Sequence, residues 1–286
     1  MPKIAYDPRR AALYQPELDE SPLRDGPPPD DAALAVEAAR LAYLRFDETA
    51  DASERLAAML ALAGFGTPAL FDDPVTDGQA YGALRGDGLA LLAFRGTQPD
   101  KAGDLVSDVQ VAHRPWELGA GFVHAGFRTT ALGLWPGVQA WLAGPARQRQ
   151  RLIVCGHSLG AAIATLLAAP AGADHLLTIG SPRVGDAAFM AALESTPGIT
   201  ITRIVHCCDV VTELPPALLG FVHGGELIYI DRDGGLHPGA APALINSDRQ
   251  QARLDYLARY AFRAGTLLAR DLADHAPMNY VRAFWA

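Results

Sequence analysis

The sequence has few cysteines. Its 286 residues include three, Cys155, Cys207 and Cys208, and two of these are adjacent. An odd count with one adjacent pair does not make the disulfide framework of a small secreted domain. Neighbouring residues of a strand point to opposite faces, so we expect no bridge between Cys207 and Cys208. The cysteines and histidines also lack the spacing of a zinc site, so we predict a protein without metal or cofactor.

Positive charge is also scarce. The chain has 24 lysines and arginines against 32 aspartates and glutamates, which gives a formal net charge of −8. Sequence-independent binding to nucleic acid requires a basic face, and so does electrostatic docking on an anionic membrane. The composition argues against both kinds of partner and leaves apolar contact as the route to a lipid surface.

The chain also lacks two segments that would direct it to a membrane. Its first residues do not show the basic and then apolar pattern of a cleaved signal peptide. Residues 152–173 contain no charged side chain and are long enough to span a bilayer, but the pattern changes halfway, at a stretch of glycine, histidine and serine. We interpret this stretch as a buried strand, a sharp turn and a buried helix, and we expect no integral membrane segment. The expected location is the cytoplasm, or outside the cell by export without a cleaved signal peptide.

Apolar residues, in contrast, are plentiful. They make up 50% of the chain and charged residues 20%, which is typical of a globular protein with a sizeable core. Prolines crowd the first 30 residues and predict an irregular N-terminal arm over 1–30. We find no repeat or linker after it, so residues 31–286 are predicted to form a single domain.

Strand patterns alternate with helix patterns in that domain. Strands are expected over 79–84, 89–94, 152–155, 176–179 and 199–206, with a hairpin within 221–230. Helices are expected over 32–46, 53–63, 125–142, 158–169, 185–193 and 247–272. The last of these should bury Leu254, Leu257, Ala261, Ala264 and Leu268. Such alternation predicts an α/β fold, with a mostly parallel sheet covered by helices on both faces.

The clearest chemical signal is the sequence Gly-His-Ser-Leu-Gly at 156–160. An apolar strand precedes it and an apolar helix follows it, which is the context of a G-x-S-x-G nucleophile elbow. The turn would expose the Ser158 hydroxyl to a base, and the two glycines would remove side chains that clash there. At the start of the helix, the N–H of Leu159 is placed to bind an oxyanion. The ordinary alternative is a buried turn without chemistry.

A serine nucleophile of this type needs a carboxylate and then a histidine later in the chain. Asp209 follows the strand expected over 199–206, at its carboxyl end, where functional groups gather in α/β sheets. His223, His237 and His275 all come after Asp209. Chain order alone leaves these three open as the base.

Several motifs together resemble the class 3 (fungal-type) lipase family of α/β-hydrolases, over about residues 79–281. They occur in the family's order and are Phe94-Arg95-Gly96-Thr97, Val123-His124-Ala125-Gly126-Phe127, the elbow at 156–160, Gly180-Ser181-Pro182-Arg183-Val184-Gly185, the stretches 203–211 and 214–216, and Asp274-His275 with Tyr280.

The resemblance implies a role for each matching residue. Ser158 would be the nucleophile, Asp209 the orienting acid and His275 the base, while Thr97 and Leu159 would form the oxyanion hole. Residues 98–121 occupy the place of the family's lid and carry several apolar side chains. Arg95 is expected to be structural, because a charge beside a core strand needs a partner.

The implied function is a carboxylic-ester hydrolase of the triacylglycerol lipase or esterase type, acting through an acyl-enzyme. Its partner would be an acyl-ester or lipid substrate, with transient contact to a lipid interface. Two alternatives are kept. One is a phospholipase A-type acyl hydrolase, and the other, from a different class, is a catalytically silent lipase-like binding module.

Overall fold

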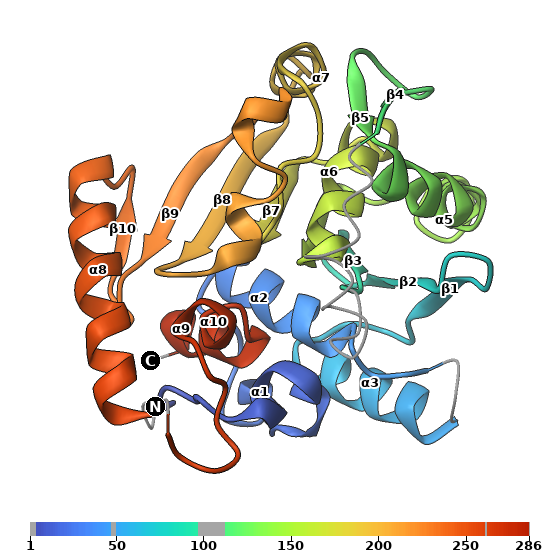
Figure 1. Cartoon of the computed structure of the whole chain (residues 1–286). Helices are drawn as coiled ribbons and strands as arrows, with labels where there is room; N and C mark the ends of the chain where they lie inside the picture. Colours follow the sequence, from blue (N-terminus) through green and yellow to red (C-terminus); the bar gives the residue numbers. More distant parts are fainter. Residues whose placement is uncertain (1–3, 47–49, 97–111, 261, 286) are drawn as a thin grey trace.

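The computed structural model describes residues 4–46, 50–96, 112–260 and 262–285. Within them, one eight-stranded sheet has the order β1-β2-β3-β6-β7-β8-β9-β10 (Figure 1). The strands from β3 to β9 run parallel, and antiparallel strands extend the sheet at each edge. The strands are β1 (Ala69–Asp73), β2 (Gly78–Leu84), β3 (Leu89–Phe94), β6 (Arg151–His157), β7 (His175–Ile179), β8 (Thr200–His206), β9 (Glu226–Ile230) and β10 (Leu236–Pro238).

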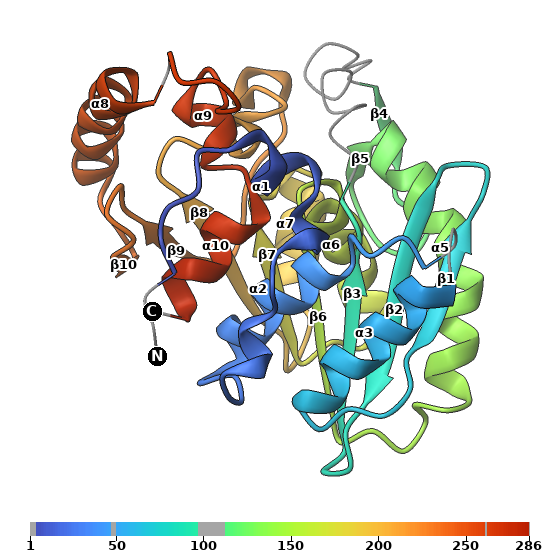
Figure 2. The same ribbon diagram turned by 90° about the horizontal axis from the view of Figure 1, so that it is seen from below.

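Helices cover both faces of this sheet (Figures 1 and 2). They are α1 (Arg10–Tyr14), α2 (Asp31–Leu41), α3 (Ala50–Leu62), α5 (Ala125–Ala143), α6 (Leu159–Ala171), α7 (Ala187–Glu194), α8 (Pro242–Arg259), α9 (Arg270–Ala273) and α10 (Pro277–Phe284). A small hairpin of β4 (His113–Pro115) and β5 (Phe122–His124) stands apart from the sheet. The predicted α/β-hydrolase architecture is confirmed.

The sheet has a hydrophobic core on each face, which explains why the sequences of the central strands are continuous apolar runs. In β3, Leu92 and Phe94 pack into the core beneath α5 and α6, while Leu91 and Ala93 pack into the core beneath α2 and α10. Consecutive side chains of a strand point to opposite faces, and both faces are covered here, so every position is apolar. The β6 strand, which leads to Ser158, is therefore held on both sides.

The N-terminal segment packs on the C-terminal helices. Its α1 lies against α9 and α10 (Figure 2). The backbone N–H of Asp7 donates to Asn279 Oδ1 over 2.8 Å, and Asn279 Nδ2 donates back to the Asp7 carbonyl over 2.8 Å. The described part of the predicted arm is thus bound to the domain along these contacts. The division at residue 30 stays a prediction.

The expected helix over 247–272 is wrong. The α8 helix begins at Pro242 and ends at Arg259, and α9 begins only at Arg270. The leucines expected to be buried face solvent instead, with Leu254 57%, Leu257 52% and Leu268 74% exposed. The packed face of α8 is formed by Ala252 and Tyr256, four residues apart. Both sets have helical spacing, so periodicity alone could not tell which face turns inward.

Two strands near the edges of the sheet differ from the expectations, whereas the helix expected over 125–142 is confirmed as α5. A hairpin was expected within 221–230, but this stretch contains one strand, β9, and its antiparallel partner β10 lies beyond it. The edge strand β1 was not predicted. Helix α5 continues through Pro136, which is exposed, so the carbonyl that loses its helical hydrogen bond can be solvated.

The uncharged stretch 152–173 folds as β6, the turn at Ser158 and α6. Across the described ranges, no helix combines the length and the apolar character that crossing a bilayer would need.

Candidate active site

Ser158 lies at the turn between β6 and α6. Its backbone has φ 58° and ψ −125°, a strained conformation for a residue with a side chain. Its N–H donates to the carbonyl of Ile179 on the neighbouring strand β7, over 3.0 Å. The turn is therefore fixed to the sheet, and the strain is held by the packed elements on either side.

The glycines around Ser158 are required by close backbone contacts. A Cβ at Gly156 would lie 2.3 Å from the carbonyl carbon of Gly160, and a Cβ at Gly160 would lie 2.1 Å from the carbonyl oxygen of Phe94. Real Cβ atoms do not approach backbone atoms so closely, so neither position accepts a side chain. The spacing of the two glycines follows from the packing of α6 against β6 and β3.

The structure brings Ser158, His275 and Asp209 together from three distant segments. His275 Nε2 lies 3.0 Å from Ser158 Oγ, and His275 Nδ1 lies 2.9 Å from Asp209 Oδ2. All three residues are buried. Asp209 Oδ1 also accepts the N–H of Val211 over 2.9 Å, which fixes the carboxylate at the carboxyl end of β8. This chain of contacts can pass a proton from the hydroxyl to the imidazole.

Tyr280 shares the carboxylate oxygen that contacts His275. Its hydroxyl donates to Asp209 Oδ2 over 2.5 Å and accepts the N–H of His206 over 3.1 Å. Burial and the neighbouring Asp209 hold the pKa of the Tyr280 phenol well above its ordinary value, so this hydroxyl keeps its proton. The sequence marked Tyr280 as part of a motif, but its contact with Asp209 becomes visible only in the fold.

His157 supports His275 from the other side. Its Nε2 lies 2.9 Å from the His275 carbonyl oxygen, and its Nδ1 lies 2.7 Å from the Tyr43 hydroxyl. The rings of His157 and His275 lie with their centroids 4.5 Å apart. Burial, reinforced by His275, lowers the pKa of His157 well below its ordinary value, so the ring is neutral. His157 can then donate from Nε2 to the carbonyl and accept the Tyr43 hydroxyl.

Only part of the expected oxyanion hole lies within the described residues. Leu159 is the first residue of α6, where backbone N–H groups have no acceptor within the helix and the helix dipole favours a negative charge. Thr97 lies outside the described residues, as does the 98–111 part of the expected lid at 98–121. The roles of Thr97, Leu159 and the lid remain predictions.

The other candidate histidines are engaged elsewhere. His223 Nε2 lies 2.7 Å from the Thr212 carbonyl oxygen, and His237 Nε2 lies 2.7 Å from Asp231 Oδ2. Neither contacts Ser158 or Asp209 among the hydrogen bonds of the described residues. Of the three histidines that chain order left open, the fold brings His275 to the serine.

Arg95 has the partner that its position requires. Its Nη2 donates to the Asp77 carbonyl over 2.7 Å and pairs with Asp77 Oδ1 at 3.0 Å. The charge at the end of β3 is thus neutralised by the turn before β2, in agreement with the structural role expected for Arg95.

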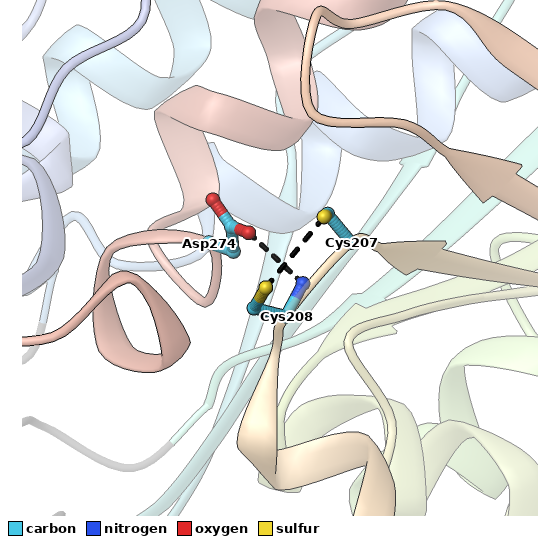
Figure 3. Close-up of side chains that lie close together, drawn as sticks. All are labelled: Cys207, Cys208 and Asp274. Carbon is cyan, nitrogen blue, oxygen red and sulfur yellow. Dashed lines mark hydrogen bonds between the residues drawn. The ribbon is translucent and has the colours of Figure 1, made fainter. Parts of the chain in front are cut away.

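Cys207, Cys208 and Asp274 also lie close together (Figure 3). The two Sγ atoms and a carboxylate oxygen of Asp274 are within 4.8 Å of one another. The two cysteines are free, but their Sγ atoms lie 3.6 Å apart, because the chain has left β8 and strand alternation no longer applies. Asp274 already accepts the N–H of Cys208, the Tyr6 hydroxyl and the Arg270 guanidinium.

A metal ion does not fit this cluster. Metal-binding thiols must ionise, whereas the hydrogen bond from Cys208 and burial raise the pKa of Cys207. Asp274 would also have to give up partners that compensate its buried charge. Catalysis without metal or cofactor stays the prediction.

Comparisons with known proteins agree with the family resemblance of the motifs. Residues 91–219 match the family model described as Lipase (class 3). A lipase from Rhizopus niveus is 35% identical over 157 residues, which cover 49% of this chain and 38% of that protein. The chain therefore matches less than half the length of this curated relative.

Two solved structures have the same fold. One, described as a triacylglycerol lipase with a serine protease triad as its catalytic centre, aligns with a TM-score of 0.59 and 27% identity, covering 70% of this chain and 77% of that one. A lipase from Rhizopus microsporus var. chinensis aligns with a TM-score of 0.59 and 25% identity, covering 71% and 76%.

Proposed function

Because this chain belongs to the class 3 lipase family, we propose that it hydrolyses carboxylic esters through an acyl-enzyme formed on Ser158. The observation that carries the proposal is the continuous contact from Ser158 Oγ to His275 and from His275 to Asp209. A serine hydroxyl is a poor nucleophile unless a base takes its proton, and here the base lies within hydrogen-bonding distance.

The proposed reaction has two steps. Ser158 Oγ attacks the ester carbonyl carbon while His275 Nε2 takes the hydroxyl proton, and the resulting oxyanion is stabilised by the N–H of Leu159. The bond to the alcohol oxygen then breaks, and His275 returns the proton to that oxygen. Water next gives a proton to His275 and attacks the acyl carbon. The bond between that carbon and Ser158 Oγ then breaks, His275 returns the proton to Oγ, and the acid is released. Asp209 holds the imidazole and stabilises its charged form.

The proposed substrate is an acylglycerol or a simpler acyl ester. We propose that the enzyme meets lipid through apolar side chains beyond the carboxyl end of β8. Leu218 is 87% exposed, on a short helical turn (Ala217–Leu219), and Phe122 is 48% exposed on β5. His113 connects these segments, because its Nε2 lies 2.9 Å from the Leu219 carbonyl oxygen. Exposed apolar groups gathered in this way favour transient contact with an interface.

Hydrolysis of p-nitrophenyl esters of increasing acyl length tests the proposal. Wild type should be active and Ser158→Ala should lose activity. Ser195→Ala should match wild type, because it removes an exposed hydroxyl that donates to the Ala192 carbonyl rather than to the triad. The acyl length that gives the highest kcat/KM separates an esterase from a lipase. Equal inactivity of wild type and Ser158→Ala on every ester, with and without detergent, would instead support a binding module.

A further inference from the structure

A cavity of about 400 Å³ lies between the N-terminal segment, α8 and the last two helices. The described residues that line it do not include Ser158, Asp209 or His275. Tyr6, Tyr256 and Tyr260 contribute aromatic surface to it. Its charged lining consists of Arg232, Arg259, Arg270, Arg282, Asp233 and Asp255. With four cations against two carboxylates, the cavity carries an excess of positive charge.

Arg282 is a buried cation in the lining of this cavity. It is 7% exposed, and among the described residues no carboxylate lies within ion-pair distance of it. Its Nη2 donates to the Asp233 carbonyl over 3.1 Å, and its guanidinium lies 5.0 Å from the centre of the Tyr6 ring. Its Nη1 is buried and has no hydrogen-bond partner in the described structure. A buried cation with an unpaired donor is costly, because neither its charge nor that donor is compensated.

Arg270, which also lines the cavity, differs from Arg282 in having a carboxylate partner. It has the same exposure, 7%, but its Nε pairs with Asp274 Oδ2 at 3.0 Å, so its charge is already compensated. Burial is the main cause that lowers the pKa of Arg282, and the nearby Arg270 lowers it further.

Arg259 adds a second available cation at the rim. It is the last residue of α8, is exposed, and has no ion-pair partner among the described residues. Arg232 forms only long contacts, 3.6 Å to Asp233 and 3.8 Å to Asp248. Arg259 and Arg282 are therefore the lining arginines for which the described residues provide no ion-pair partner.

We propose that this cavity is a binding site for a small organic oxyanion, a phosphate or a carboxylate, held by Arg282 and Arg259. A planar guanidinium with several N–H donors suits both groups, and charge-assisted bonds to it are among the strongest hydrogen bonds in proteins. The tyrosine rings would contact the carbon skeleton of the ligand. The site is separate from the triad and does not depend on the esterase proposal.

Isothermal titration calorimetry on the full chain in low-chloride buffer tests the site. The probes are inorganic phosphate, glycerol 3-phosphate and butyrate, with sodium chloride as the non-specific control. The variants are Arg282→Gln and Arg259→Gln, and Arg147→Gln is the matched control, because it removes an exposed arginine that does not line the cavity.

At least one oxyanion should bind wild type and Arg147→Gln with one-to-one stoichiometry, and each cavity variant should weaken binding by about tenfold or more. Binding of the phosphates alone identifies a phosphate site, and binding of butyrate alone identifies a carboxylate site. If Arg282→Gln does not fold, the binding measured for Arg259→Gln tests the proposal. No binding at millimolar concentrations, equal binding by the cavity variants, or an equal response to chloride would overturn the proposal.

Discussion

Tyr280 donates a hydrogen bond to the same oxygen of Asp209 that lies beside His275. The carboxylate is buried and is fixed by Tyr280 at 2.5 Å and by the backbone of Val211 at 2.9 Å. Tyr280 is thus a positioning residue in the proposed mechanism, because it acts on the imidazole through Asp209.

Removing the Tyr280 hydroxyl should therefore affect both catalysis and stability. In Tyr280→Phe, Asp209 loses a donor and the N–H of His206 loses its acceptor, while the ring still fills its site. We expect kcat to fall by about tenfold with little change in KM, and the free energy of unfolding to fall by about 1–3 kcal/mol. Steady-state kinetics and urea denaturation measure both. An unchanged kcat with lowered stability would reduce Tyr280 to a purely structural role.

The elbow should not accept a methyl group at Gly160. In Gly160→Ala the new Cβ meets the Phe94 carbonyl, so α6 must move away from β3, and Ser158 moves with it. We expect a loss of about 1–3 kcal/mol in the free energy of unfolding, together with a large loss of activity. Gly86→Ala is the control, because a Cβ there meets no atom within 4 Å. Denaturation curves that coincide for the two variants would contradict the packing described for α6.

Buried neutral histidines should make the protein less stable in acid. Burial is the main cause that lowers the pKa of His157, of His206 and, to about 3, of His223. In the unfolded chain these rings bind protons near pH 6.5, whereas in the native state they do not. The unfolded state thus gains protons first, and stability falls as pH drops below about 6.5.

With a folded-state pKa of about 3, His223 contributes a slope of up to about 1.4 kcal/mol per pH unit within that window. We expect His223→Gln to reduce the slope of the unfolding free energy between pH 6 and pH 5, relative to wild type. Urea titrations at several pH values check this. An equal slope in the variant would show that His223 takes up a proton in the folded state as readily as in the unfolded state.

Local sequence patterns predicted much of the fold, because the central strands are buried on both faces and the helices between them have clear limits. The elbow was visible for the same reason, since Gly156, Ser158 and Gly160 are close in sequence. Patterns failed where the outcome depends on distant partners. In α8, Tyr256 lies at helical spacing from Ala252, and Leu257 lies at helical spacing from Leu254. Which of the two faces is buried depends on the elements that pack against the helix.

The rest of the candidate site shows the same limit. His275 could be separated from His223 and His237 only through the family resemblance, because nothing local distinguishes the three. The contacts of Tyr280 with Asp209 and of His157 with Tyr43 span 71 and 114 residues. A short motif cannot predict which side chains come into contact when they are so far apart in the sequence.

The most direct test of the central claim is reaction with a fluorophosphonate, followed by peptide mapping with mass spectrometry. The account predicts a single adduct on Ser158, formed rapidly by wild type and much more slowly by His275→Ala, since the base would be missing. Labelling of another residue, or labelling of Ser158 at the same rate without His275, would contradict the assignment of these two residues.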